Sequence, residues 1–251
     1  MTAILDVRGA SRHFHGLKAV DDVSFSVPAK GVTAVIGPNG AGKTTLFNII
    51  SGSMSPSAGS IVLEGADVTT MAPEVKAARG LVRTFQLVKL FGDLSAAGNV
   101  AVGFHLVTRG GLFASLVRPR WFRDSEKHVG EEAVRLLDLV GLAEMASYPA
   151  AILPYGQQRL LEIARALAAK PKILLLDEPA AGLNTEESTK LAETIRKIAA
   201  DGVAVLLIEH DMKLVMDIAE EIVVLDYGHK IAQGTPGEVR RDPAVIAAYL
   251  G

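Results

Sequence analysis

The apolar positions of this chain fall into short unbroken runs, separated by stretches that repeat at helical spacing. Residues 32–36, 173–176 and 203–208 consist almost entirely of Val, Ile, Leu and Ala. Runs of this length without alternation are typical of strands that are buried on both faces, as in a parallel sheet. Residues 185–200 instead place their apolar side chains on one face of a helix. The pattern therefore predicts an α/β fold with a parallel core sheet.

Two pairs of segments indicate antiparallel strands outside that core. Residues 3–8 and 22–28 alternate enough to predict an antiparallel β flap that leads into the core. Residues 221–226 and 229–233 predict a closing hairpin around Tyr227-Gly228. The core sheet is therefore expected to be mixed. Shorter elements are expected as strands at 60–64 and 81–85, and as helices at 73–79, 236–241 and 243–250.

Strand signals stop in the middle of the chain. Residues 95–106 and 125–140 show helical spacing, and a third helix follows them. We therefore expect residues 93–168 to form a helical subdomain. The core and its β flap are then formed by residues 1–92 and 169–251.

The segment 107–123, between the first two of these helices, has two interpretations. It mixes a Gly-Gly pair with large apolar side chains and several arginines. One interpretation is an interfacial membrane segment, and the other is a long ordered loop. We favour the loop, because charges interrupt every apolar run.

The composition limits what the chain can do. With 251 residues, 49% apolar and 22% charged, it can bury a substantial core. A net charge of −2 and a pI of about 6.3 leave no basic footprint for nucleic acid. The absence of cysteine excludes disulfides and thiolate metal sites. The N-terminus does not resemble a secretory signal, and no apolar run approaches the roughly 18 residues of a membrane span. We therefore expect a soluble, cytoplasmic protein that reaches a membrane only through a partner.

The strongest chemical signal is a glycine-rich stretch that joins the first buried strand to a helix. It consists of Gly37, Pro38, Asn39, Gly40, Ala41, Gly42, Lys43, Thr44 and Thr45. Glycine, four residues and then Gly-Lys-Thr matches the phosphate-loop pattern. The strand at 32–36 and the helical residues 46–50 supply the context that the pattern requires. A chance glycine turn is the alternative, and the order of the elements argues against it.

Each residue type in this stretch has a physical reason. Glycines adopt positive φ and let backbone amides approach a ligand, and the helix N-terminus adds partial positive charge. Lys43 is placed to reach the β- and γ-phosphates as a point charge. The Thr44 hydroxyl is placed to ligate Mg²⁺, and Thr45 is a candidate contact of the α-phosphate. The stretch therefore predicts a site for a polyphosphate with Mg²⁺.

Two carboxylates, Asp177 and Glu178, end the apolar run at 173–176. Unpaired buried charge is costly, so two acids at this point need a reason. A magnesium ion beside the phosphate loop supplies one for Asp177. Glu178 is then available as a base toward water. A solvated strand end is the alternative, and the phosphate loop makes it the weaker one.

Three further candidates are left open by their position alone. Gln86 follows the strand at 81–85, at the edge where ligands bind in open α/β sheets, although a lone Gln is usually a loop residue. His210 falls one strand after Asp177 at the same edge, although alone it resembles a surface histidine. Phe14 is either a core residue or a stacking surface for a purine, and its spacing favours the core.

A second possible anion site lies at the start of a helix, at Pro154-Tyr155-Gly156-Gln157-Gln158. Pro and Gly at a helix start leave backbone amides that point outward. The alternative is an ordinary helix N-terminus, which we would favour if the acidic strand end at Asp177-Glu178 did not follow.

Taken in order, these motifs resemble the nucleotide-binding subunit of an ABC transporter, over essentially the whole chain. Within that superfamily the chain is similar to the ATP-binding subunit of branched-chain amino-acid importers. The stretches that carry this similarity are 155–159, 177–184 and 208–212, with 234–236 and 248–251 in the tail. The resemblance implies a P-loop NTPase fold of the ABC type that uses ATP and Mg²⁺ and couples ATP hydrolysis to transport.

The resemblance implies a role for each matched residue within one subunit. Phe14 stacks on adenine, which reverses the preference for the core, and residues 37–45 hold the phosphates. Asp177 supports Mg²⁺, and Glu178 polarises the attacking water. His210 contacts the γ-phosphate.

The resemblance also implies contacts with other subunits. Gln86 senses Mg²⁺ and the attacking water and couples them to a permease. Tyr155, Gly156 and Gln157 hold the γ-phosphate bound to an opposing ATPase subunit, so that two chains enclose two ATP molecules head to tail. The implied partners are a second ATPase subunit, permease subunits and, indirectly, a substrate-binding protein outside the cell. Nucleic acid is not expected.

Two positions depart from the family pattern. Pro154 replaces the serine of the usual Leu-Ser-Gly-Gly-Gln signature, so the hydroxyl that would face the γ-phosphate is missing, and Tyr155 replaces a glycine. Asn184 stands where the loop after Glu178 usually carries an aspartate. The second change puts the intersubunit role of that loop in doubt.

Three rival functions stay open at this point. The same ATPase could serve another substrate, such as urea, short amides or lipid, because the substrate never touches this chain. A soluble ABC ATPase acting on DNA or ribosomes would be expected to show duplicated cassettes, a coiled-coil insertion or a basic face, and the sequence shows none of these. A non-hydrolysing regulator is disfavoured by the presence of Glu178 and His210.

Overall fold

The computed structural model describes residues 3–84, 89–106 and 120–250. The chain divides into two compact units, which we describe separately. Unit 1 comprises Met1–Arg83 and Lys172–Gly251, and unit 2 comprises Thr84–Pro171. The inserted unit therefore runs from residue 84 to residue 171, whereas the sequence pattern placed the helical subdomain at 93–168.

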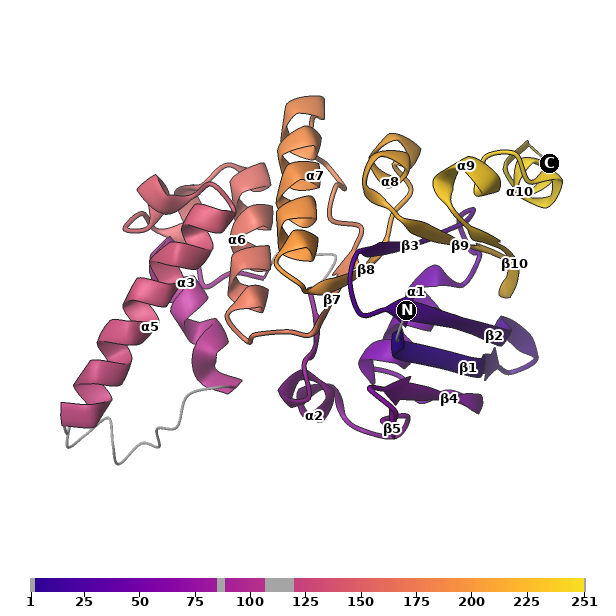
Figure 1. Ribbon diagram of the computed structural model, residues 1–251, viewed down its shortest axis with the longest axis horizontal. Helices are drawn as coiled ribbons and strands as arrows, with labels where there is room; N and C mark the ends of the chain where they lie inside the picture. The colour runs from indigo at the N-terminus through magenta and orange to yellow at the C-terminus, as the bar shows by residue number, and fades with distance from the viewer. Residues whose placement is uncertain (1–2, 85–88, 107–119, 251) are drawn as a thin grey trace. The chain divides into compact units, whose positions relative to one another are not determined.

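A six-stranded sheet forms the centre of unit 1, in the order β10-β9-β3-β8-β7-β6 (Figure 1). Its strands are β3 (Val32–Ile36), β6 (Leu81–Arg83), β7 (Ile173–Asp177), β8 (Ala204–Ile208), β9 (Glu221–Asp226) and β10 (His229–Gly234). All neighbours pair in parallel except β9 and β10, which form an antiparallel hairpin. Every residue of β3, β7 and β8 is buried, as unbroken apolar runs require. The expected mixed sheet is confirmed.

A second sheet of unit 1 is antiparallel, with the order β2-β1-β4-β5. Its strands are β1 (Ala3–Phe14), β2 (Leu17–Pro28), β4 (Ala58–Leu63) and β5 (Ala66–Asp67). The expected β flap is thus present, and β1 and β2 are longer than their alternation predicted. The pairing of β1 with β2 continues past Val7 through register shifts, which break the alternation without ending the strand.

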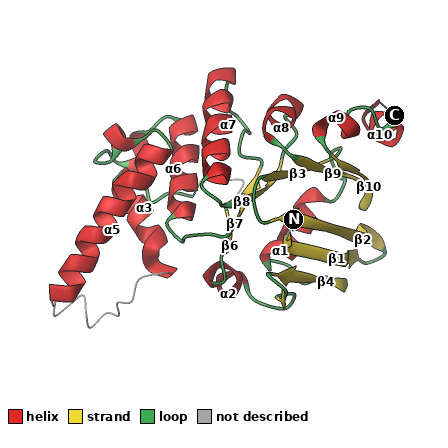
Figure 2. Ribbon diagram, viewed as in Figure 1, coloured by secondary structure: helices red, strands yellow, loops and turns green. Residues whose placement is uncertain are grey.

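The helices of unit 1 pack on these sheets (Figure 2). They are α1 (Lys43–Ser51), α2 (Pro73–Ala78), α7 (Thr185–Ala200), α8 (Met212–Ile218), α9 (Pro236–Val239) and α10 (Pro243–Leu250). Helix α1 contacts β1 and β2 on one side and β6 and β7 on the other, so it lies between the two sheets. The sequence pattern did not predict α8, because seven residues are too few to show a helical period.

Unit 2 is helical. It contains α3 (Ala96–Gly103), α5 (Arg120–Leu139) and α6 (Tyr155–Leu167), with short 3₁₀ turns η1 (Phe104–Leu106), η2 (Ala143–Met145) and η3 (Ala150–Ile152). The three α-helices contact one another pairwise. Gly103 permits a close approach of α3 and α6, because a Cβ there would lie 2.1 Å from the carbonyl oxygen of Arg165.

The predicted end of the loop at 107–123 is wrong, because α5 already begins at Arg120. Residues 107–119 lie outside the described part of the chain. Within that described part, no helix is both long and apolar enough to cross a lipid bilayer.

Candidate nucleotide-binding site

The phosphate loop runs from the end of β3 to the start of α1, and backbone space explains two of its glycines. A Cβ at Gly37 would lie 2.1 Å from the Leu225 carbonyl oxygen, and one at Gly42 would lie 2.2 Å from that of Ala19. Both residues also have positive φ, which glycine adopts without steric penalty. Gly40 has positive φ as well, but open space lies where its Cβ would be. The loop is therefore packed against the protein at Gly37 and Gly42 and open at Gly40.

Lys43 lies inside this loop. Its Nζ donates to the carbonyl oxygens of Gly37 at 2.7 Å and Pro38 at 2.9 Å, and the residue is only 7% exposed. Burial lowers the pKa of Lys43, and the charge of Glu178 opposes that shift. The ammonium group is thus held among the loop carbonyl oxygens, and its contact with a phosphate stays a prediction.

Helix α1 begins without a side-chain cap. Its N-cap residue is Gly42, so the first amides of the helix have no side-chain acceptor. Thr44 is exposed and Thr45 is half-buried. The amides and both hydroxyl groups are therefore available to a ligand at the positive end of α1.

A cavity of about 410 Å³ opens over this loop. Its lining is formed by Leu17, Lys18, Ala19, Asn39, Gly40, Ala41, Gly42, Lys43, Thr44, Thr45, Glu178 and Tyr227. The volume lies within the usual range of ligand sites, roughly 300–1,000 Å³. The cavity therefore brings the phosphate loop and Glu178 to one place, as expected from the sequence, and adds Leu17 and Tyr227, which were not expected.

Asp177 is buried at the end of β7, and its partner is Arg83 at the end of β6. Arg83 Nη2 donates to Asp177 Oδ2 at 2.5 Å, while Nη1 donates to Asn48 Oδ1 at 2.7 Å and Ser51 Oγ at 3.0 Å. The arginine thus balances the buried carboxylate and ties it to α1. Sequence reasoning missed Arg83, because the pattern placed it inside a strand at 81–85, whereas β6 ends at Arg83.

Glu178 follows β7 with φ of +46°, the left-handed region that a residue with a Cβ adopts at an energetic cost of about 1–3 kcal/mol. Its backbone amide donates to the Ile208 carbonyl oxygen at 3.0 Å, which fixes this turn to the end of β8. The side chain is half-buried and lines the cavity. The strained turn therefore presents the carboxylate to the cavity that contains Lys43.

Glu209 is fully buried and joins two loops of the site. Its Oε1 accepts from the Ala180 amide at 2.7 Å, and its Oε2 accepts from the amides of His210 at 2.9 Å and Asp211 at 3.2 Å. The loop after Glu178 and the loop that carries His210 are thus held by one carboxylate. Sequence reasoning gave Glu209 no role, although an acid at the end of the strand beside β7 was a signal.

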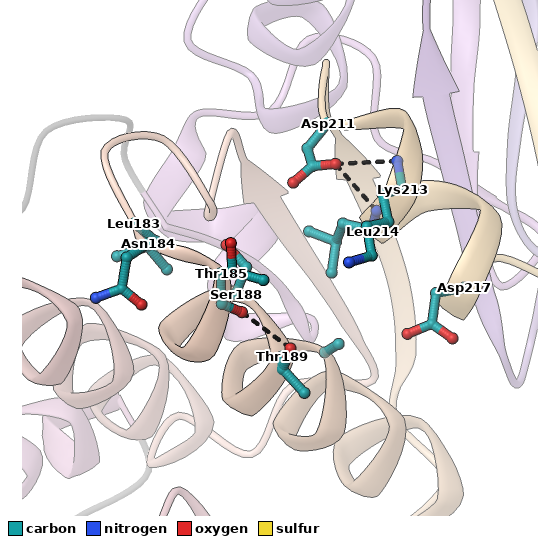
Figure 3. A pocket seen from close by; sticks show the side chains of 10 residues that line it. Leu183, Asn184, Thr185, Ser188, Thr189, Asp211, Lys213, Leu214 and Asp217 are labelled. Atoms are coloured by element: carbon teal, nitrogen blue, oxygen red, sulfur yellow. Dashed lines mark hydrogen bonds between the residues drawn. The ribbon is translucent and has the colours of Figure 1, made fainter.

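The same two loops end at capped helices. Asn184 caps α7 in a reciprocal arrangement with Glu187, and Asp211 accepts from the amides of Lys213 and Leu214 at the start of α8. Between these helix starts lies a polar cavity of about 160 Å³, with Asn184 and Asp211 at different sides of it (Figure 3). Asparagine is as good an N-cap as aspartate, so the departure at Asn184 leaves the helix start intact.

Three predicted residues stand apart from this cavity or cannot be placed. Phe14 lies at the end of β1, is 37% exposed and has the Arg12 guanidinium 4.9 Å from its ring centre. The interpretation of Phe14 as a core residue is therefore wrong, while adenine stacking stays a prediction. His210 is exposed, with Nδ1 3.8 Å from Glu209 Oε2. Gln86 lies outside the described residues.

In unit 2, the start of α6 carries the altered signature. Pro154 is the N-cap, without a side-chain hydrogen bond, and Tyr155 is exposed. Gly156 is buried and Gln157 is half-buried. Below them, Arg159 donates to Glu162 at 3.0 Å in a buried ion pair, and it donates to the Tyr155 hydroxyl at 3.4 Å.

Comparison with known proteins decides the family. A family model for the ABC transporter matches residues 20–181, and one for the branched-chain amino acid ATP-binding cassette transporter matches residues 229–251. The chain belongs to the ABC transporter family. Within that family it is an ATP-hydrolysing subunit, and the expected P-loop NTPase fold is confirmed.

Named relatives agree with this assignment. The chain is 47% identical to the high-affinity branched-chain amino acid transport ATP-binding protein BraF of Pseudomonas aeruginosa, over 99% of this chain and 98% of the relative. It is 42% identical to LivG of Escherichia coli, over the same shares. Among solved structures, the ADP conformation of MJ1267, an ATP-binding cassette of an ABC transporter, superposes with a TM-score of 0.87 at 32% identity, and the match covers 100% of both chains.

The residues of this ABC ATPase fit a nucleotide with magnesium. The cavity, the uncapped start of α1 and Lys43 suit a polyphosphate. In the described residues, no group of three or more His, Cys, Asp or Glu side chains could hold a metal by itself. Magnesium commonly binds to one or two protein oxygens together with substrate phosphates. The Thr44 hydroxyl in the cavity offers one such oxygen, whereas Asp177 is buried and paired with Arg83.

Proposed function

We propose that this chain hydrolyses ATP to drive the import of branched-chain amino acids through a separate permease. The observation that carries the proposal is the cavity of about 410 Å³, where the phosphate loop, Lys43 and Glu178 lie together. The assignment of branched-chain amino acids as the transported substrate rests on the similarity to BraF and LivG and on the family match at residues 229–251.

In this proposal, binding begins at the phosphate loop. The open backbone at Gly40 and the first amides of α1 donate to the phosphates. Lys43 exchanges its loop carbonyl partners for phosphate oxygens, which are stronger acceptors because they are charged. Burial of Lys43 favours this exchange, because a partly desolvated cation gains more from an anionic partner.

Chemistry then depends on Glu178. Its strained backbone turn points the carboxylate into the cavity, where it accepts a proton from the attacking water. Bound Mg²⁺, held by Thr44, Asp177 and the predicted ligand Gln86, would supply charge neutralisation for the phosphates. Arg83 holds Asp177 in place, and Glu209 connects the backbone of His210 to the loop after Glu178.

The proposal includes a second ATPase subunit and a permease. Tyr155, Gly156 and Gln157 at the start of α6 are assigned to the γ-phosphate bound by the opposing subunit, with backbone amides replacing the missing serine hydroxyl. The permease is assigned to the helical segment near residues 93–104, where Asp93 is exposed, with Gln86, outside the described residues, as the predicted coupling residue. This contact would bring the chain to the cytoplasmic side of the membrane.

Transport in cells tests the substrate. In cells that lack this chain, we expect uptake of labelled leucine, isoleucine and valine to fall, and wild-type protein to restore it. Glu178→Gln should not restore it, although the variant is produced at the same level. Urea, acetamide and lipid uptake are measured in the same cells. If one of these follows the chain and leucine uptake does not, the amino-acid assignment is wrong while the ATPase assignment stands.

Charge reversal at Asp93 tests the permease surface. Asp93→Lys should reduce leucine uptake strongly and leave the ATPase rate of the isolated chain within about twofold, because a rim charge acts mainly on association with a partner. Glu144→Lys, an exchange of the same charge elsewhere in unit 2, is the control. If Asp93→Lys lowers leucine uptake and the ATPase rate equally, or changes neither, this placement is wrong.

A further inference from the structure

Two hairpin turns reach the cavity over the phosphate loop, and only one of them belongs to the β flap. His15-Gly16 joins β1 to β2, and Tyr227-Gly228 joins β9 to β10. All four residues have positive φ, as in the two-residue type I′ turn. Leu17 and Tyr227, from these two hairpins, both line the cavity. The cavity thus extends from the phosphate loop to the turn at Tyr227.

The Tyr227 turn is fixed to its surroundings by its backbone. The Gly228 amide donates to the carbonyl oxygen of Ala41, in the phosphate loop, at 3.1 Å. The Gly228 carbonyl oxygen accepts from the Asp21 amide at 2.9 Å. A Cβ at Gly228 would lie 3.0 Å from the carbonyl oxygens of Lys18 and Ala19. The position of Tyr227 relative to the phosphate loop is therefore set by hydrogen bonds and close packing.

The Tyr227 side chain is not explained by folding. It is 83% exposed, so its ring adds little to the core. Its φ of +42° is a conformation that Asn or Gly adopts more readily than Tyr, so the turn itself would be better served by another residue. An exposed aromatic ring beside a ligand cavity, held in a left-handed backbone, points to a contact with the ligand.

We propose that Tyr227 is a nucleobase-contacting residue of the nucleotide site, with its ring stacked on the base of the bound nucleoside triphosphate. Leu17 adds an apolar side chain to the lining of the same cavity, and the phosphates lie on the loop at residues 37–45. This subsite rests on the proposed nucleotide site and adds a second aromatic surface to the one predicted at Phe14. Because every base has a π-face, such stacking does not distinguish one base from another.

The decisive variant is Tyr227→Asn. Asparagine suits the left-handed turn better than tyrosine, so the thermal midpoint of unfolding should stay the same or rise. Removal of a stacking ring typically weakens binding by about five- to 150-fold, so the affinity for ATP and for GTP should fall by the same factor, at least about fivefold. Tripolyphosphate, which has no base, should bind within about twofold of wild type. Tyr227→Phe should bind like wild type, because it keeps the ring.

Calorimetric titration of the isolated chain with Mg²⁺ and each of the three ligands measures these affinities. Phe14→Ala and Lys43→Ala are titrated in parallel. Unchanged ATP affinity in Tyr227→Asn overturns the proposal, and a loss confined to Phe14→Ala would place the base there instead. Equal losses of ATP and tripolyphosphate in Tyr227→Asn also overturn it, because the turn would then act only through Ala41. If Lys43→Ala leaves tripolyphosphate binding unchanged, the phosphate site itself is wrong, and the subsite falls with it.

Discussion

The starts of α1 and α6 carry the proposed phosphate contacts, and both lack a side-chain cap. Gly42 precedes α1 and Pro154 precedes α6, and neither has a side-chain oxygen that could accept from the first amides. By contrast, side chains cap four other described helices, namely α3, α7, α8 and α9, at Ser95, Asn184, Asp211 and Thr235. An N-terminal amide without a protein partner is available to an anion. Helix α2 is also uncapped, but it has six residues and an acidic side chain, Glu74, in its first turn.

The two helix starts differ in what surrounds them. At α1 the amides lie beside Lys43, in a cavity that also contains Glu178. At α6 the nearby cation, Arg159, is already matched by Glu162, which is buried with it. The first site has a cation and a carboxylate within one unit, whereas the second offers mainly backbone amides and a helix dipole. This difference is what we expect if the start of α6 completes a site on another subunit.

The largest effect is expected when the start of α6 is made negative. Gly156→Asp should abolish ATP-driven dimerisation and hydrolysis, because the carboxylate repels the γ-phosphate and occupies its place. ATP binding to the isolated chain should not change. Size-exclusion chromatography, phosphate release and ATP titration measure the three properties. Gly156 is buried, so Gly156→Ala serves as the control for packing, and the unfolding midpoint is compared for both variants. Full hydrolysis by Gly156→Asp, in an assembly where both sites need this chain's α6, would rule out the assignment.

The next effect concerns Glu178, the proposed base at the α1 site. Glu178→Gln should lower the turnover rate by about 10² to 10⁴, the usual contribution of a positioned base, while ATP stays bound. A closed dimer should then accumulate with Mg-ATP, visible by size-exclusion chromatography. Wild-type phosphate release by Glu178→Gln would mean that another group activates the water.

Removal of the cation at the α1 site should act on binding instead of chemistry. Lys43→Ala should weaken ATP binding by about 30-fold or more, or roughly 2 kcal/mol, as for loss of a charge-assisted hydrogen bond. Lys18→Ala is the matched control, because Lys18 lines the same cavity but is exposed and paired with Asp21. Titration of a fluorescent ATP analogue measures both. Equal ATP affinities of the two variants would contradict the role of Lys43 as the cation that distinguishes the α1 site from the start of α6.

The smallest effect is expected at Pro154. Pro154→Ser restores the hydroxyl of the usual signature and adds a side-chain cap to α6, worth about 1 kcal/mol of stability. The unfolding midpoint should therefore rise, and turnover should change only a few-fold, because the proposal assigns the γ-phosphate to backbone amides. A change in turnover above about tenfold would show that the hydroxyl, and not the helix start, decides recognition at α6.

The predicted and the missed parts of the site differ in how far apart their partners lie along the chain. The phosphate loop and the acidic end of β7 are each contained in a few consecutive residues, so their pattern predicts both strand and chemistry. Arg83 and Asp177 are 94 positions apart, and Glu209 and Ala180 are 29 apart. A local pattern can mark one member of such a pair, as at Glu209, but only the parallel pairing of β6, β7 and β8 brings the two members together.

The sequence by itself determined the elements that a few consecutive residues are enough to specify. Unbroken apolar runs predict the buried strands, and glycines that must adopt positive φ indicate the phosphate loop. Only the tertiary structure decided which exposed residues meet at the cavity. Phe14 and Tyr227 are both aromatic residues at hairpins, and the sequence pattern does not show which of them lines the cavity. The fold separates them, because the hydrogen bond between Gly228 and Ala41 brings the Tyr227 turn to the phosphate loop, whereas Phe14 does not line the cavity.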